Sequence, residues 1–389
     1  MTKKNNKITN NVVCKGVARV FKYNAGIDAV VDGNSVQMAF VKDYKGERKT
    51  MLEYTWSNKD KNGNLIQRGI KVSGHGEYGV PTLKEYDVYV ALQRIFIDKK
   101  TQNGMCTLLP DNYDDDYLII EFNITELAKQ MGYNTPSSKT RDNLKKSIDI
   151  LLATTIYSIH NGGIYDIKEK KYITNSSYGV HLIETMESID ITDSKDSSKN
   201  INYTRLRLSR FTYEQIVNDY KLFYDKSKYN KTKNLLAKKI YHLALQWKGD
   251  NKFSYANINT LVERIPMVNC EAKYRKREIK NALKALNDNE IVSIKYDDQN
   301  PNKVYFLFSD DNIKPVDKKY KTFKEIQQRY HELGFSDNEI DEYLDIEKIR
   351  YIQALLRYMD NKKNIKDAKK YFVKCYKKPI EIPGIYFGD

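Results

Sequence analysis

The chain has 389 residues, of which 40% are apolar, 30% charged and 12% aromatic. This composition supports folded cores and excludes wholesale disorder. Lys and Arg outnumber Asp and Glu by 66 to 51, a net charge of +15, so nucleic acid is the first partner class to consider. No apolar run reaches the roughly 18 residues of a membrane span, and the N-terminus lacks the apolar core of a signal peptide. The four cysteines lie far apart, which fits a reducing compartment, so we expect a cytoplasmic protein without a membrane segment.

The first segment in chain order, 1–77, is predicted to be a β-rich extension. Val12–Tyr23, Val36–Val41 and Met51–Trp56 are short runs rich in residues that favour strands. The tripeptide 32–34, Asp-Gly-Asn, is typical of a turn between two of these strands.

The central part of the chain contains an internal repeat with a period of about 135 residues. Short amphipathic helices are predicted at 124–133 and 258–267, and each is followed by a second helix with one apolar face. The matching apolar positions are Leu144, Ile148 and Leu151 in the first copy, and Ile279, Leu283 and Leu286 in the second.

Each copy of the repeat also has a leading helix and a trailing β-hairpin. The leading helices are predicted at 88–96 and 236–247, and the hairpins at 156–167 and 291–308. Helix, short helix, turn, helix and hairpin is the order of elements in a winged helix-turn-helix.

The fold class predicted by these patterns is α+β, with two tandem winged helix-turn-helix domains, a β-rich N-terminal extension and a small helical C-terminal tail. Polar segments set the boundaries between them. They are 1–77 for the extension, 78–190 for the first winged helix, 191–202 for a linker, 203–308 for the second winged helix, 309–321 for a linker and 322–389 for the helical tail. Within the tail, Ser336 and Glu339 have the spacing of a capping box, and Gly334 is expected to end a helix.

Positive charge is concentrated in the second copy. Residues 203–308 hold 21 basic and 11 acidic side chains, net +10, whereas residues 78–190 hold 12 and 16, net −4. In a winged helix the helix after the turn enters the major groove and the wing contacts the backbone. We therefore predict contacts with double-stranded DNA from the second copy at Lys273, Arg275, Lys276, Arg277, Lys280, Lys284, Lys295 and Lys303.

The first copy offers a smaller set of candidates on its corresponding helix. They are Ser137, Ser138, Lys139, Arg141, Lys145 and Lys146. An exposed basic helix face is often only a solvated surface, and the acidic balance of this block leaves a dimerisation role open in place of DNA contact.

A basic chain with two winged helices in tandem resembles the plasmid replication initiators. The stretch 78–95, YGVPTLKEYDVYVALQRI, looks like the opening of the first winged helix of the replication initiator protein A group, and the resemblance covers roughly residues 78–308. It implies that the second winged helix is the main DNA-contacting module at origin repeats, and that the first contributes DNA binding or dimerisation. It also implies recruitment of the host replicative helicase or its loader, while monomer and homodimer both stay open. The run 351–378 is similar to helical tails of bacterial replication-restart proteins.

Enzyme signatures are weak in this sequence. Gly74, Gly76 and Gly79 form a GxGxxG pattern, but Pro81 follows and no β-α-β unit completes a nucleotide site. The five histidines are never closer than 21 residues, and Asp114–Asp116 lies in a polar loop. We predict no catalytic residue, no metal and no cofactor. A winged-helix transcriptional regulator and a metal-dependent origin-nicking endonuclease remain the alternatives.

Overall fold

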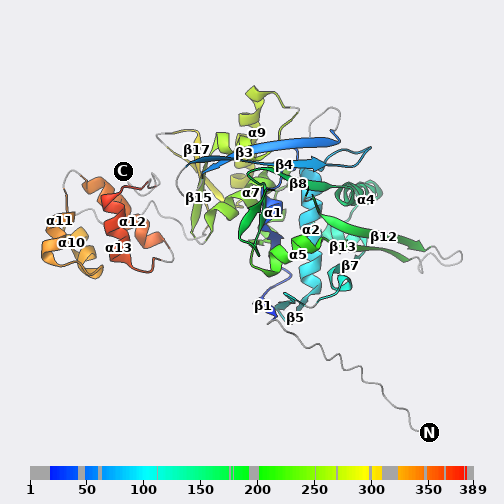
Figure 1. Cartoon of the computed structure of the whole chain (residues 1–389), viewed down its shortest axis with the longest axis horizontal. Helices are drawn as coiled ribbons and strands as arrows, with labels where there is room; N and C mark the ends of the chain where they lie inside the picture. Colours follow the sequence, from blue (N-terminus) through cyan, green and yellow to red (C-terminus); the bar gives the residue numbers. More distant parts are fainter. Residues whose placement is uncertain are drawn as a thin grey trace, which may run out of the picture. The chain divides into compact units, whose positions relative to one another are not determined.

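The computed structural model describes residues 18–42, 49–59, 64–111, 113–174, 177, 179–191, 201–249, 251–268, 270–297, 300–308, 323–345, 348–362, 365–380 and 382. Helices and antiparallel sheets both occur along this part of the chain, which confirms the α+β class (Figure 1). The chain divides into two compact units, residues 1–239 with 263–271, and residues 240–262 with 272–389.

The first unit is built around helix α2 (Leu83–Lys99), which is buried along most of its length. The helix begins at a capping box, in which the Glu85 carboxylate accepts a hydrogen bond from the Thr82 backbone N–H at 2.9 Å. The apolar face predicted for 88–96 is fully inside the core. The other helices of this unit are α1 (Gly33–Gln37), η1 (Asp115–Leu118), α3 (Ile124–Gln130), α4 (Ser138–Leu152), α5 (Arg210–Val217) and α6 (Lys226–Asn230).

Antiparallel sheets of the first unit join strands that are far apart in sequence. The sheet orders are β1-β6-β5, β10-β9, β11-β8-β4-β3, β12-β13-β7 and β14-β2. The strands are β1 (Arg19–Lys22), β2 (Asp28–Asp32), β3 (Met51–Lys59), β4 (Leu65–Ser73), β5 (Thr101–Gln102), β6 (Met105–Leu108), β7 (Ile119–Phe122), β8 (Thr155–His160), β9 (Ile164–Asp166), β10 (Lys171–Ile173), β11 (Gly179–His181), β12 (Ile183–Ile191), β13 (Ile201–Leu208) and β14 (Lys221–Asp225). Because β1, β2 and β4 pair with later strands, the described part of 1–77 belongs to this unit and is not a separate extension.

The strand predicted at Val36–Val41 is wrong, because helix α1 covers its start. Asp32 is the N-cap of this helix, and its carboxylate accepts a hydrogen bond from the Ser35 backbone N–H at 2.9 Å. The Ser35 hydroxyl and the Gln93 side chain on α2 also donate hydrogen bonds to Asp32, the latter at 3.0 Å. The Asp-Gly-Asn signal at 32–34 therefore starts a helix and does not connect two strands.

The hairpin predicted at 156–167 is also not formed as expected. Strand β8 pairs with β4 and β11, whereas β9 pairs with β10. A Cβ atom at Gly163 would lie 2.4 Å from the Gly69 carbonyl oxygen, so glycine allows the chain to pass close to β4 at this turn. The first copy of the repeat thus keeps its helices, while β8 enters a four-stranded sheet and β9 forms a two-stranded sheet with β10.

Both ends of the linker predicted at 191–202 belong to strands in the structure. Asp190 pairs with Asn202, and Ile191 pairs with Ile201, in the antiparallel β12–β13 pair. Residues 192–200 lie outside the described residues. The division between the compact units falls instead after residue 239, within helix α7 (Leu235–Lys248). Polar residues are typical of the connection between two strands as well as of a linker between domains, so the composition of this segment does not distinguish the two.

The second unit contains the second copy of the repeat. Its helices α8 (Ile258–Arg264) and α9 (Ala272–Asp288) accompany strands β15 (Phe253–Asn257), β16 (Ser293–Tyr296) and β17 (Lys303–Leu307), with sheet order β15-β17-β16. The last two residues of α8 fall in the first unit. Strands β16 and β17 pair with each other, as the sequence predicts.

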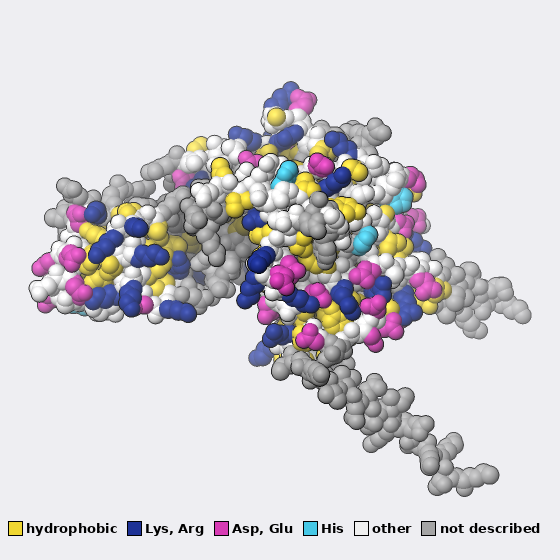
Figure 2. All heavy atoms as spheres, viewed as in Figure 1, with side chains coloured by type: hydrophobic (Ala, Val, Ile, Leu, Met, Phe, Trp, Pro, Cys, Tyr) yellow, Lys and Arg dark blue, Asp and Glu magenta, His cyan; other side chains and the backbone are white. Residues whose placement is uncertain are grey.

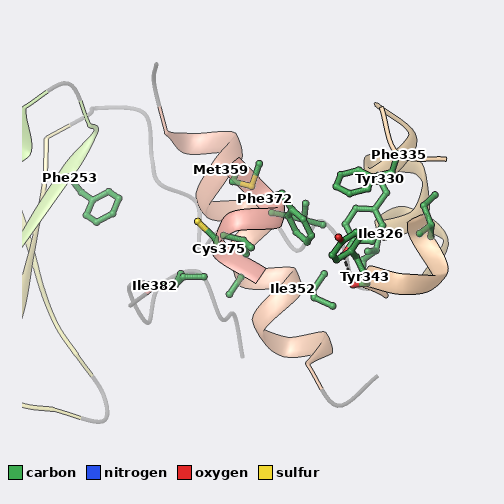
Figure 3. Packing of buried hydrophobic residues seen from close by; sticks show 14 of the residues in the cluster. Phe253, Ile326, Tyr330, Phe335, Tyr343, Ile352, Met359, Phe372, Cys375 and Ile382 are labelled. Carbon is green, nitrogen blue, oxygen red and sulfur yellow. Dashed lines mark hydrogen bonds between the residues drawn. The ribbon is translucent and has the colours of Figure 1, made fainter. Parts of the chain in front are cut away.

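The C-terminal segment of the second unit is helical, as expected. An aromatic group with Tyr330, Phe335 and Phe372 forms its core, with ring centroids 5.1–5.7 Å apart (Figure 3). Gly334 follows the first helix with φ +86°, and the Ser336–Glu339 capping box is present. The helices are α10 (Phe323–Glu332), α11 (Asp337–Tyr343), α12 (Ile349–Asn361) and α13 (Ala368–Lys377). The linker predicted at 309–321 lies outside the described residues.

Candidate nucleic-acid interface

Helix α9 has one buried face and one basic face. Residues three and four apart lie on the same side of a helix, and the buried side consists of Ile279, Ala282, Leu283 and Leu286. Basic residues make up much of the exposed surface, which they share with Tyr274, Asn281, Asn287 and Asp288. Figure 2 shows dark-blue side chains over α9 at the top of the view. The exposed basic residues of this helix are Lys273, Lys276, Arg277, Lys280 and Lys284.

The two arginines of α9 are not equivalent. Arg275 is half-buried and lies four residues before Ile279, at the border of the buried face. Arg277 is exposed and projects from the opposite side of the helix. Arg277 is therefore the more accessible of the two arginines of α9 that are predicted to contact DNA.

The β16–β17 hairpin, which the sequence analysis predicts to be a wing, is held in shape by Asp297. Its carboxylate accepts hydrogen bonds from the Asn300 backbone N–H at 3.0 Å and from the Tyr305 hydroxyl at 2.7 Å. Lys295 lies opposite Tyr305 in the β16–β17 register, and Lys303 is two residues before Tyr305 on the same strand. Because side chains alternate along a strand, Lys295 and Lys303 lie on the same face of the β16–β17 hairpin.

Helix α4 in the first unit presents a less charged surface. Ser137 is its N-cap and accepts a hydrogen bond from the Thr140 backbone N–H at 3.2 Å, so this residue already has a structural role. Lys146 is exposed, and its Nζ lies 3.6 Å from the centroid of the Tyr78 ring. Of the other predicted residues, Ser138, Lys139 and Arg141 are exposed and Lys145 is half-buried. The structure thus places the fourteen predicted residues in two groups, six in the first unit and eight in the second.

The GxGxxG segment forms a compact loop. Gly79 has φ +75°, and backbone hydrogen bonds join His75 and Gly79 in both directions, at 3.0 and 2.7 Å. The His75 Nδ1 atom accepts hydrogen bonds from the backbone N–H groups of Glu77 and Tyr78, at 3.1 and 3.3 Å. The segment thus directs two of its N–H groups to the His75 ring, whereas a phosphate-binding loop directs such groups to its ligand.

The acidic run Asp114–Asp116 takes part in surface ion pairs. Asp115 lies 2.7 Å from the Arg207 guanidinium, and Asp116 lies 3.9 Å from that of Arg205. Asp114 caps the short helix η1. Among the described residues, no three His, Cys, Asp or Glu side chains gather as a metal site would require, and no helix is long and apolar enough to span a bilayer.

Two tyrosines of the second unit lie beside the predicted cations, and the sequence analysis did not assign them. Tyr274 on α9 is 37% exposed and Tyr255 on β15 is 43% exposed. The Lys303 Nζ lies 4.8 Å from the Tyr255 ring centroid. Tyr274 interrupts the basic run Lys273–Arg277, and that placement is the signal by which it could have been found.

No protein-family description matches the chain, and no curated protein matches its sequence. The crystal structure of RctB domains 2–3 is similar with a TM-score of 0.42 and 11% identity, over 71% of this chain and 97% of that chain. A crystal structure of selenomethionine derivatives of domain 2 and domain 3 of RctB gives a TM-score of 0.43 and 13% identity, over 70% and 94%. Similarity at this level assigns neither a family nor a function.

Proposed function

We propose that this protein is a non-enzymatic, sequence-specific DNA-binding protein that initiates plasmid replication. It binds repeats at an origin, distorts the duplex and recruits the host replicative helicase or its loader. The observation that carries the DNA-binding part is the basic face of α9, next in sequence to the β16–β17 hairpin. In a winged helix this combination puts the helix in the major groove and the hairpin on the backbone.

Within this proposal the cations of α9 divide into two roles. Arg277 lies in the N-terminal half of α9, where a guanidinium can donate two hydrogen bonds to O6 and N7 of guanine. Lys280 and Lys284 are exposed farther along the helix, and Lys295 and Lys303 lie on the wing. These lysines contribute affinity by neutralising phosphates and releasing counterions.

The first unit has a secondary part in the proposal. Helix α4 is exposed on one side. Two of its six candidate DNA-contacting residues already have structural contacts, because Ser137 caps the helix and Lys146 contacts the Tyr78 ring. We assign α4 to weaker DNA contact or to self-association. The oligomeric state is settled by light scattering of the free protein and of the DNA complex.

The DNA-binding proposal is tested by selecting duplexes from a random pool with the full chain. The selected duplex and a scrambled duplex of the same composition are then compared at one salt concentration. We expect at least about 10³-fold preference for the selected duplex, in the range of specific DNA-binding proteins. Equal affinity for both duplexes would contradict sequence-specific binding.

The initiation role rests on the resemblance to plasmid initiators and is tested separately. A plasmid that carries the gene, its neighbouring DNA and no other origin should replicate, and deletion of the selected repeats should abolish replication. A transcriptional regulator would instead bind at a promoter and leave replication unchanged. A nicking endonuclease would convert supercoiled origin DNA to the open circle with Mg²⁺ or Mn²⁺, and we expect no such conversion.

A further inference from the structure

Tyr274 has an unusual position on the basic face of α9. The residue is 37% exposed, and two cations approach its ring. The Lys273 Nζ lies 4.8 Å from the ring centroid, and the Arg277 Cζ lies 4.6 Å from the same point. The buried face of α9 is on the other side of the helix, so the ring contributes little to the core.

A tyrosine ring attracts cations because its π-system is negative on the faces, and the attraction acts within about 6 Å of the centroid. Tyr274 and Arg277 are three residues apart, which places their side chains next to each other on the helix surface. The ring opposes the mutual repulsion of the Lys273 and Arg277 charges, and it restricts the rotamers of two long side chains. A stacked guanidinium uses its flat face, while its N–H donors lie in the plane of the group.

We propose that Tyr274 is a positioning residue that pre-orients Arg277 and Lys273 for duplex DNA. This inference rests on the proposed function and extends it, because it explains how the long side chains of Lys273 and Arg277 are oriented for DNA before binding. Ordering a flexible side chain on binding costs about 0.5–1.5 kcal/mol, and restriction of that side chain before binding removes part of the cost. The ring itself makes no required contact with the DNA.

Two substitutions separate the ring from the hydroxyl group. Tyr274→Phe keeps the ring face and removes the hydroxyl, whereas Tyr274→Leu removes the ring and keeps an apolar side chain suited to a helix. Neither change alters the net charge. Tyr133→Leu is the matched control, because Tyr133 is 38% exposed and has the Lys233 Nζ 4.9 Å from its ring centroid, in the first unit.

The experiment measures the affinity of the full-length variants for the selected and scrambled duplexes by fluorescence anisotropy, over a range of salt. Tyr274→Leu should lose about two- to five-fold in affinity for the selected duplex, the size of an exposed cation–π interaction. Tyr274→Phe and Tyr133→Leu should stay close to wild type. All variants should keep the wild-type slope of log K against log salt, because no charge is removed.

A double-mutant cycle with Arg277→Gln completes the test. If the ring acts through Arg277, the loss caused by Tyr274→Leu shrinks when Arg277 is already absent. Independent, additive losses would overturn the proposal, as would equal losses for Tyr274→Phe and Tyr274→Leu, which would indicate a direct hydroxyl contact. Thermal unfolding of each variant separates these outcomes from a loss of folded protein. Wild-type protein that does not distinguish the two duplexes would remove the proposed function, and this inference with it, before any variant is compared.

Discussion

Lys238 and Asp87 form a buried ion pair in the first unit, with 2.8 Å between the lysine Nζ and Oδ2 of the carboxylate and side chains 3% and 5% exposed. The Tyr229 hydroxyl donates to the other carboxylate oxygen at 2.9 Å. Lys238 lies on α7 and Asp87 on α2, so the pair joins two helices that are far apart in the sequence. Removing one partner leaves the other charge buried without compensation.

We expect Asp87→Asn to lower the free energy of unfolding by about 3–5 kcal/mol, the usual cost of breaking a buried ion pair. Denaturant unfolding of the folded protein measures this loss. The control is Glu53→Gln at the exposed Lys71–Glu53 pair, 3.8 Å apart, where the change should stay within about 1 kcal/mol. Equal losses at the two sites would show that the buried Lys238–Asp87 pair contributes no more to stability than an exposed pair.

Lys239 should give the stability a pH dependence. Burial lowers the pKa of this lysine well below its ordinary 10.5, although the charge of Asp32 opposes the shift. Between that lowered pKa and 10.5 the unfolded chain binds more protons than the folded chain, so the free energy of unfolding increases with pH. The increase is at most about 1.4 kcal/mol per pH unit, and it is lost as the pH falls through the native pKa.

The variant Lys239→Met isolates this contribution. Wild type should gain stability relative to the variant as the pH rises from about 7 to about 8.5, below the range in which buried tyrosines begin to matter. Denaturant midpoints at several pH values provide the measurement. A constant difference between the two proteins over this range would mean that burial does not lower the native pKa of Lys239 below about 8.5.

Arg277 should contribute more to DNA recognition than Arg275. The first is exposed, and the second is half-buried at the border of the apolar face. Arg277→Ala is expected to cost about 1–3 kcal/mol on the selected duplex and to relax base choice at one position. Arg275→Ala should mainly lower stability, and Arg141→Ala on α4 should cost less affinity. A larger loss for Arg141→Ala would make the first unit the principal DNA-contacting module.

The affinity for DNA should depend steeply on salt. If about six phosphates are contacted, log K falls with log salt at a slope near −5. Changing Lys280 and Lys284 to Gln should reduce the magnitude of this slope by about 2. Lys170 and Lys171 are exposed in the first unit, and the same change there should leave the slope intact. A slope near zero for wild type would make the basic face only a solvated surface.

The loop at 74–79 should tolerate substitution of Gly76 but not of Gly74. A Cβ atom at Gly74 would lie 2.4 Å from the Gly79 carbonyl oxygen, whereas a Cβ at Gly76 would meet no atom within 4 Å. Gly74→Ala should therefore lower the melting temperature by several degrees, and Gly76→Ala should leave it unchanged. Neither variant should alter ATP binding, which we expect to be absent in wild type. A nucleotide-binding loop would instead lose affinity with both changes.

Much of the helical part of this fold could be predicted from the sequence. The apolar positions of α2, α4 and α9 recur every three or four residues, and all three faces are buried as expected. The basic residues of α9 are correspondingly exposed, apart from Arg275. Helical hydrogen bonds connect residues four apart, so a helix and its faces are recorded in neighbouring residues.

The tertiary structure alone decided how the strands are arranged and which polar groups are buried. Strand β8 could have paired with β9, but β4 and β11 flank it, and β2 pairs with β14 from much later in the chain. Strand pairing and burial join residues that are distant in sequence, so no local pattern records the partner. For the same reason the Lys238–Asp87 pair could not be told from ordinary surface charge in the sequence.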